Sequence, residues 1–154
     1  MPPLGWVIDM RSERHAFMVT LYNRRFESRE AAFAAEEVMY VTIERKEAFA
    51  SLAGLLKVQE AETRRRLPPN TEFQYSGWKS DRDRQYHIRS IYIPGRQAIE
   101  ITAFAEFPAF YAVCVLLTPL SNIKINFPRL IFVMDWLLGM EKQPEPGPAV
   151  DKSS

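Results

Sequence analysis

Residues 64–106 read RRRLPPNTEFQYSGWKSDRDRQYHIRSIYIPGRQAIEITAFAE, and the chain changes character inside this stretch. The arginines and prolines at its start mark the end of a helix, because proline cannot continue one. Beyond them, β-branched and aromatic residues alternate with polar ones, and Pro94 and Gly95 have the spacing of a type II turn. The pattern predicts an antiparallel meander with strands at residues 72–79, 84–93, 97–106 and 109–117.

The residues before this stretch are typical of a hairpin followed by helices. Residues 4–9 and 15–22 predict the hairpin, and Ser28 is a candidate N-cap for a first helix. Residues 44–67 predict a longer helix, because their apolar residues recur at spacings of three and four. Residues 38–43 fit either a strand or a continuation of the first helix.

The C-terminal part predicts one more helix over residues 127–139, with a proline in its first turn and Gly139 as its stop. This segment is apolar almost all round, which is typical of a helix that is fully buried or packed against another chain. Because complete burial is difficult to arrange in a small domain, we expect an oligomer or partner interface. Its residues would be Leu130, Met134, Trp136 and Leu137. Residues 143–154 predict a disordered, proline-rich tail.

These segments predict a single α+β domain over residues 1–142. A chain of 154 residues is most simply one domain, and a composition of 47% hydrophobic and 25% charged residues allows an ordinary core. We expect an N-terminal β-hairpin, one or two helices, a three- to four-stranded antiparallel meander and an apolar C-terminal helix. The helices should cover one face of the sheet.

Basic and aromatic residues gather in the predicted meander. The whole chain has a net charge of +1, but residues 64–96 contain eight basic side chains and three acidic ones. Tyrosine, tryptophan and arginine are also the residues enriched at protein–protein hot spots. We therefore expect a face that binds an acidic protein partner. The residues assigned to it are Trp78, Lys79, Arg82, Arg84, Tyr86, Arg89 and Arg96.

This face favours a non-enzymatic protein-binding or regulatory module, such as an inhibitor, an immunity-type protein or an accessory subunit. Binding of single-stranded nucleic acid or of a phosphorylated ligand is the alternative, because stacking aromatic rings and cations also serve that purpose. A sequence pI of about 7.9 lies below the basic range expected of a nucleic-acid-binding domain. The pattern therefore fits a protein partner better than a nucleic acid.

The sequence lacks the common catalytic and cofactor motifs. Its six glycines do not form a nucleotide-phosphate loop. Its two histidines, His15 and His87, do not form a metal-binding pair, so we expect no metal and no cofactor. His87 is a candidate acid or base beside Arg89, but no third group with a catalytic spacing accompanies it. An enzyme without a recognisable motif is the third hypothesis.

Other features predict a cytoplasmic protein of bacterial origin. The single cysteine, Cys114, lies in an apolar run and cannot form an internal disulfide. Two apolar segments, 107–120 and 127–140, are too short and too interrupted to span a membrane, and the N-terminus lacks the pattern of a signal peptide. The excess of arginine over lysine, 14 to 6, is common in proteins from GC-rich bacterial genomes.

Overall fold

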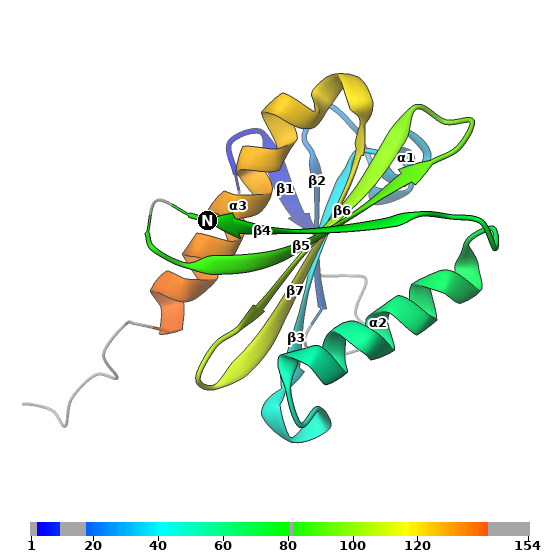
Figure 1. Cartoon of the computed structure of the whole chain (residues 1–154). Helices are drawn as coiled ribbons and strands as arrows, with labels where there is room; N and C mark the ends of the chain where they lie inside the picture. The colour runs from blue at the N-terminus through cyan, green and yellow to red at the C-terminus, as the bar shows by residue number, and fades with distance from the viewer. Residues whose placement is uncertain (1–2, 10–17, 81, 142–154) are drawn as a thin grey trace, which may run out of the picture.

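The computed structural model describes residues 3–9, 18–80 and 82–141, and the predicted tail at 143–154 lies outside this part of the chain. Seven antiparallel strands form one sheet in the order β1-β2-β3-β7-β6-β5-β4 (Figure 1). The strands are β1 (Trp6–Asp9), β2 (Met18–Asn23), β3 (Val38–Arg45), β4 (Phe73–Lys79), β5 (Gln85–Ile93), β6 (Ala98–Glu106) and β7 (Phe110–Pro119). The helices are α1 (Arg29–Ala34), α2 (Leu52–Arg66) and α3 (Ile123–Glu141).

The predicted α+β class, the N-terminal hairpin and the four-stranded meander are confirmed. The four strands of the meander are β4 to β7, and each pairs with the next in the chain. The turn after β5 contains Gly95 with a φ of 79°, and Arg96 N–H donates to Ile93 O, as a type II turn requires. The local spacing of turn residues therefore sets the register of this hairpin.

Residues 38–43, which fitted either a strand or a helix, form most of β3. This strand joins the hairpin and the meander into one sheet, because it pairs with β2 on one side and with β7 on the other. After β3 the chain passes through α2 to the far edge of the sheet, where β4 begins. It then returns strand by strand, so that β7 ends beside β3.

The predicted helix over residues 44–67 starts later than expected. Glu44 and Arg45 belong to β3 and pair with the start of β7. The helix α2 begins at Leu52, directly after Ser51, whose hydroxyl oxygen accepts a hydrogen bond of 3.1 Å from Gly54 N–H. The predicted N-cap of the first helix is confirmed, since Ser28 accepts from Ala31 N–H in the same way.

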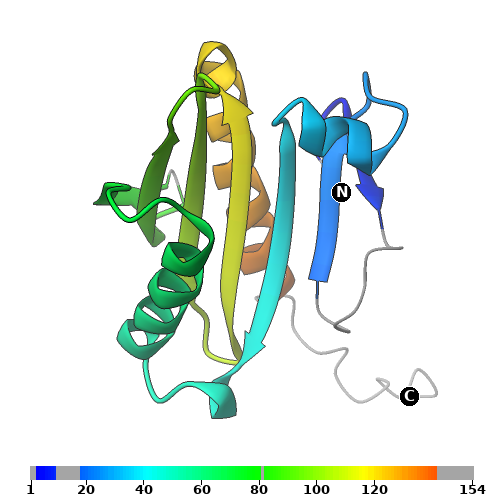
Figure 2. The same ribbon diagram turned by 90° about the vertical axis from the view of Figure 1, so that its right-hand side faces the viewer.

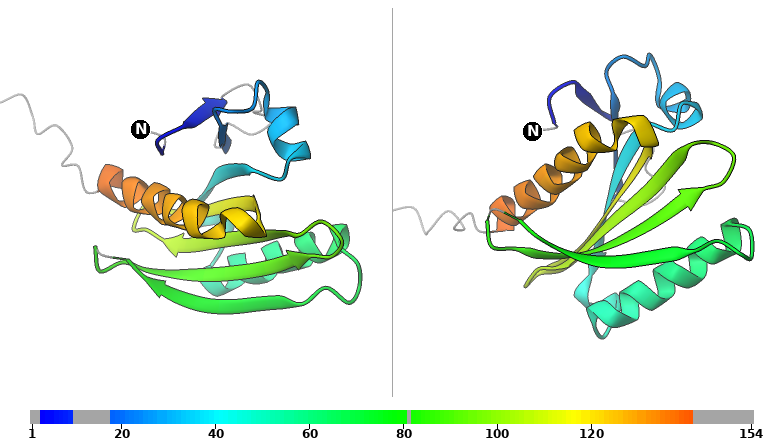
Figure 3. Two further views of the ribbon diagram at one scale, coloured as in Figure 1. Left: turned by 90° about the horizontal axis from the view of Figure 1, so that it is seen from above. Right: turned by 45° about the horizontal axis from the view of Figure 1, so that its top comes forward.

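The two long helices lie on opposite faces of the sheet, not on one face as expected (Figures 2 and 3). The reason is that both faces of β7 are apolar. Ala112, Cys114 and Leu116 pack with the apolar side of α3, and Val113 and Val115 pack with Leu55 of α2. A continuous apolar run is typical of a strand that is covered on both sides, and each side here needs its own helix.

The helix α3 starts four residues before the predicted segment and contains Pro128 in its interior. Its buried residues join the largest of three core clusters, which extends across the sheet from Trp6 of β1 to Tyr86 of β5. No helix in the described ranges has both the length and the apolar character needed to cross a membrane.

Candidate binding groove beside the edge strand

The seven residues assigned to the partner-binding face do not form one surface. Lys79 and Arg82 are exposed at the β4–β5 turn, and Arg84, beside them, is half-buried. Arg96 is exposed in the β5–β6 turn, at the opposite end of β5, where it pairs with Glu36 at 3.1 Å. At roughly 3.3 Å per residue, the length of β5 separates these two turns by more than 20 Å.

Tyr86 and Arg89 are buried, so they cannot belong to a docking face. Their side chains are 0% and 2% exposed, respectively. The two positions differ by three, an odd number, so the two side chains point to opposite sides of β5. Tyr86 lies under α3 with the largest core cluster, and Arg89 lies under α2, next to Thr63. Their burial follows from the position of β5 inside the sheet with a helix over each face.

Trp78 instead forms one wall of a groove between β4 and α3. The groove has a volume of about 340 Å³. The ring of Trp78 meets that of Phe127 edge to face, with centroids 4.9 Å apart at an interplanar angle of 84°. The remaining lining residues are Lys79, Ser80, Pro128, Ile131, Phe132 and Asp135. Trp78 and Phe132 are 44% and 49% exposed, so aromatic surface remains open to a ligand.

The register of the sheet explains why these side chains meet. Trp78 pairs directly with Tyr86, so both lie on the face that α3 covers. The Tyr86 hydroxyl reaches up from the sheet and donates a hydrogen bond of 2.5 Å to Oδ1 of Asp135 on α3. This hydrogen bond joins the middle of α3 to β5. The residues of α3 that line the groove, such as Phe132, therefore lie beside the edge strand β4.

The buried tyrosines predict a loss of stability at high pH. Burial, followed by the hydrogen bond to Asp135 and its negative charge, raises the pKa of Tyr86 above the ordinary value of 10.0. Burial and the charge of Glu100 raise the pKa of Tyr40 to about 12. The native state thus holds these protons more tightly than the unfolded state. Their contribution is complete below pH 10.0, the unfolded value, and is lost as the pH rises through the native values.

We therefore expect the free energy of unfolding, measured by urea titration, to fall between about pH 10 and pH 12. In Tyr86→Phe the fall should be shallower, because one of the protons that distinguishes the native from the unfolded state is gone. A variant whose free energy of unfolding falls as steeply as that of the wild type would contradict this assignment.

Three of the four residues assigned to an oligomer interface face the protein's own core. Leu130, Met134 and Leu137 of α3 are buried against the sheet, so they have no surface to offer to another chain. Trp136 is different, since it is 41% exposed. The sheet is wide enough to cover one side of α3 completely, which is why the apolar helix needs no second chain to bury these three residues.

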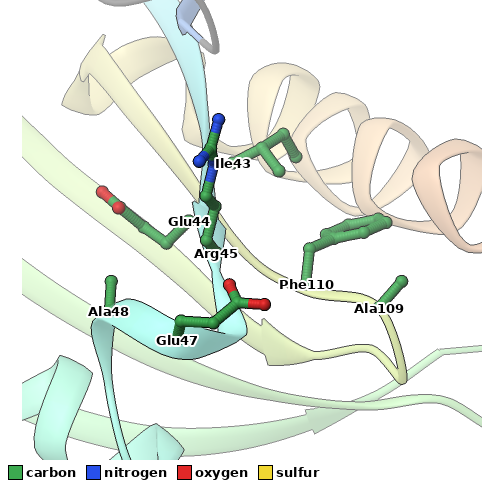
Figure 4. Close-up of a pocket in the computed structure, with 7 residues that line it drawn as sticks. All are labelled: Ile43, Glu44, Arg45, Glu47, Ala48, Ala109 and Phe110. Carbon is green, nitrogen blue, oxygen red and sulfur yellow. The ribbon is translucent and has the colours of Figure 1, made fainter.

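A second hollow lies where the end of β3 meets the β6–β7 turn (Figure 4). Glu44, Arg45 and Glu47 contribute its charged groups, and Ile43, Ala48, Ala109 and Phe110 complete the lining. Figure 4 shows Glu44 pointing away from Phe110, whereas the Glu47 carboxylate points toward it. The lining contains no histidine, serine or cysteine, so its candidate acid–base or nucleophilic groups are the carboxylates of Glu44 and Glu47.

The histidine and cysteine candidates among the described residues stand apart from other catalytic groups. The side chain of His87 is exposed on β5 and forms no hydrogen bond or ion pair with another described residue. Burial raises the pKa of the Cys114 thiol, which makes that side chain a poor nucleophile. Within the same residues, no three histidine, cysteine, aspartate or glutamate side chains gather closely enough to hold a metal ion.

Comparison with known proteins gives no family for this chain. No protein-family model matches the sequence, and no curated protein matches it significantly. The groove beside β4 must therefore be interpreted from its own geometry.

Sequence reasoning identified Trp78 and Lys79 but missed the other side of the groove. Phe127, Phe132 and Asp135 come from a helix about fifty residues later, and no local pattern connects them with β4. One signal was present: Asp135 is the only acidic residue in the apolar run 127–140. A charged residue inside such a run requires a partner or an open space.

Proposed function

We propose that the protein is a non-enzymatic binding module that captures an extended segment of a partner protein along β4. The observation that carries this proposal is the position of the groove. Aromatic side chains of α3 and β4 line it, and it runs directly beside a strand that lies at the edge of the sheet. An inhibitor, an immunity-type protein or an accessory subunit would act through such a site.

The edge of β4 suits strand addition. One side of β4 pairs with β5, and no other described strand pairs with its second side. Six of its seven residues are exposed, and none of the seven is a proline. Proteins usually protect such edges, and an open one can accept an extended peptide through main-chain hydrogen bonds. The alternating side chains of the peptide would then reach the groove next to Trp78.

Charge along this edge supports acidic flanks in the partner segment. Arg65 and Arg66 are exposed at the end of α2, and the neighbouring Arg64 stacks on Phe73 at the start of β4. Lys79 and Arg82 are exposed near the other end of the strand. Cations at both ends would steer an acidic segment to the edge and would lower its affinity at high salt.

Nucleic-acid binding has less support than it had from the sequence. Tyr86 and Arg89, which would have supplied a stacking ring and a phosphate contact, are buried. Tyr75 of β4 is also exposed, but it lies on the opposite side of the strand from Trp78, because the two positions differ by an odd number. The remaining surface is too discontinuous to track a single strand by stacking.

The test uses peptides selected from a displayed library of acidic, unstructured segments. Truncating a hot-spot tryptophan costs at least about 2 kcal/mol, so Trp78→Ala should weaken binding roughly 30-fold in titration calorimetry. Trp136→Ala is the matched control, because Trp136 is similarly exposed but does not line the groove. Hydrogen exchange should show new protection of the β4 amides when the peptide binds.

The other possible outcomes would contradict strand capture or indicate a different occupant of the edge. Equal losses in the two tryptophan variants, or no new protection in β4, would contradict strand capture. If light scattering shows a dimer that Trp78→Ala dissociates, the occupant of the edge is a second copy of the chain. If single-stranded DNA competes with the peptide at low salt, the nucleic-acid alternative gains support. We expect neither result, and we expect the protein to act in the cytoplasm.

A further inference from the structure

The carboxylate of Asp135 is the unexplained group in the groove. It is half-buried, and its Oδ1 accepts the hydrogen bond from Tyr86. Its Oδ2 makes no hydrogen bond within the described residues, and it is not among the fully buried atoms that lack a partner. Oδ2 is therefore not fully buried, on a residue that lines the groove.

No cation of the described chain forms an ion pair with Asp135. None of the ion pairs between described residues includes it, although the groove contains one lysine. The ammonium group of that residue, Lys79, lies 3.0 Å from the carboxylate of Asp83 in the β4–β5 turn. A carboxylate among Trp78, Phe127 and Phe132 is thus left with a single neutral donor, the Tyr86 hydroxyl.

We propose that the groove binds a cationic side chain, a lysine or an arginine, with its charged group on Asp135 and its stem along Trp78 and Phe132. This inference rests on the proposed capture of an extended segment and names the residue that anchors it. The cation would occupy the open position at Oδ2, while Tyr86 holds the carboxylate in place from below.

The chemistry of the lining favours a cation over an apolar or an acidic side chain. A carboxylate that is partly shielded from water attracts an opposite charge more strongly than one in bulk water does, and aromatic faces add a cation–π attraction. The long apolar stems of lysine and arginine also cover exposed ring surface. With about 30 Å³ for each molecule of liquid water, a groove of about 340 Å³ has room for such a side chain.

The anion in the groove and the cations along the edge are compatible. Asp135 lies inside the groove, whereas Lys79 and Arg82 lie at its rim and in the adjoining turn. A segment with one basic residue between acidic flanks would match both signs, and a shifted register would place like charges together. The pattern of charge would therefore determine which register binds.

Small probes test this site without the partner. The probes are n-butylguanidinium and n-butylammonium, with 1-pentanol and pentanoate as the neutral and anionic controls. The readout is the indole N–H signal of Trp78 in an NMR spectrum, assigned by its loss in Trp78→Ala. We expect both cations to shift this signal saturably and the two controls to leave it nearly unchanged.

Asp135→Asn should weaken the binding of n-butylguanidinium about ten-fold or more, because asparagine keeps an acceptor for Tyr86 but loses the charge. Glu62→Gln removes an exposed carboxylate on α2 that does not line the groove; it is the matched control and should bind like the wild type. Tyr86→Phe loses the hydrogen bond between β5 and α3 but keeps the charge of Asp135, so it should still bind the cation. Binding by this variant would show that the weaker binding of Asp135→Asn comes from the lost charge and not from a disturbed fold. Equal shifts with pentanol, or unchanged binding in Asp135→Asn, would overturn the proposal.

The result is separable from the test of strand capture. If the cations bind but no peptide does, the site at Asp135 stands and the capture of a segment is wrong. If the selected peptides bind with the expected dependence on Trp78, their basic residue is then replaced by norleucine. Unchanged affinity after that replacement would mean that the segment is captured without a cationic anchor, and would refute this inference.

Discussion

Replacing Arg89 with alanine should lower the free energy of unfolding by about 3–5 kcal/mol, the usual cost of removing one partner of a buried ion pair. The Arg89 side chain is 2% exposed and lies between the sheet and α2. Its Nη2 atom is 3.5 Å from the Glu100 carboxylate, which is itself largely buried. Without the guanidinium, the charge of Glu100 would remain in the protein interior with no cation beside it.

The surroundings of Arg89 show that this ion pair is incompletely satisfied. The guanidinium lies between the rings of Phe73 and Phe104, with its central carbon 5.4 Å from each ring centroid. Its Nη2 reaches Thr63 Oγ1 at 3.2 Å, but its Nε and Nη1 atoms and Oε1 of Glu100 have no hydrogen bond. Such a pair contributes little net stability, although breaking it is costly.

A double replacement separates these two effects. Arg89→Met with Glu100→Met removes both charges and keeps apolar volume, so it should recover most or all of the stability lost in Arg89→Ala. Arg82→Ala is the exposed control and should change the free energy of unfolding by less than about 0.5 kcal/mol. Urea titration measures all four proteins. A loss in the double variant as large as in Arg89→Ala would show that packing, not the orphaned charge, causes the effect.

The second large effect concerns α3, which sequence patterns placed in an interface between chains. Leu130→Ala should lower the free energy of unfolding by about 2–5 kcal/mol, because it removes a buried side chain and leaves a cavity against the sheet. Phe132→Ala, two residues along, should cost much less, since Phe132 is exposed at the rim of the groove.

Chemical denaturation at two protein concentrations distinguishes core from interface. If Leu130 belongs to the core of one chain, the loss should be the same at both concentrations. A loss that is larger at the higher concentration would indicate that Leu130 stabilises an oligomer instead, because stabilisation by a partner chain grows with its concentration. Phe132→Ala should affect the binding of the selected peptides more than it affects stability, which is the reverse of the behaviour expected for Leu130→Ala.

Much of the secondary structure follows from short stretches of sequence. The meander, the turn at Pro94 and Gly95, and the N-cap at Ser28 each depend on neighbouring residues whose chemistry favours one backbone conformation. The later start of α2 is also a local effect, because Ser51 caps it and the preceding β-branched residues extend β3. Alternation alone did not separate strand from helix over residues 38–43.

Burial was the harder property to predict. Tyr86 and Arg89 have the residue types of a binding face, but strand pairing places β5 between β4 and β6, and α3 and α2 cover its two sides. The apolar run of β7 indicates burial on both faces, which is typical of a strand with a helix over each side. Which residues remain exposed depends on what packs over them, and that information is not local.

The sequence by itself determined the class of fold, most of the strands and the presence of an aromatic, basic hairpin, because each depends on contacts between near neighbours in the chain. Only the tertiary structure decided which part of that hairpin is a candidate site. It buried Tyr86 and Arg89, left Trp78 exposed at the edge, and brought Asp135 beside it from a helix that follows the sheet. The physical reason is that strand order and helix packing bring distant segments together, whereas sequence periodicity reports only which way each side chain can point.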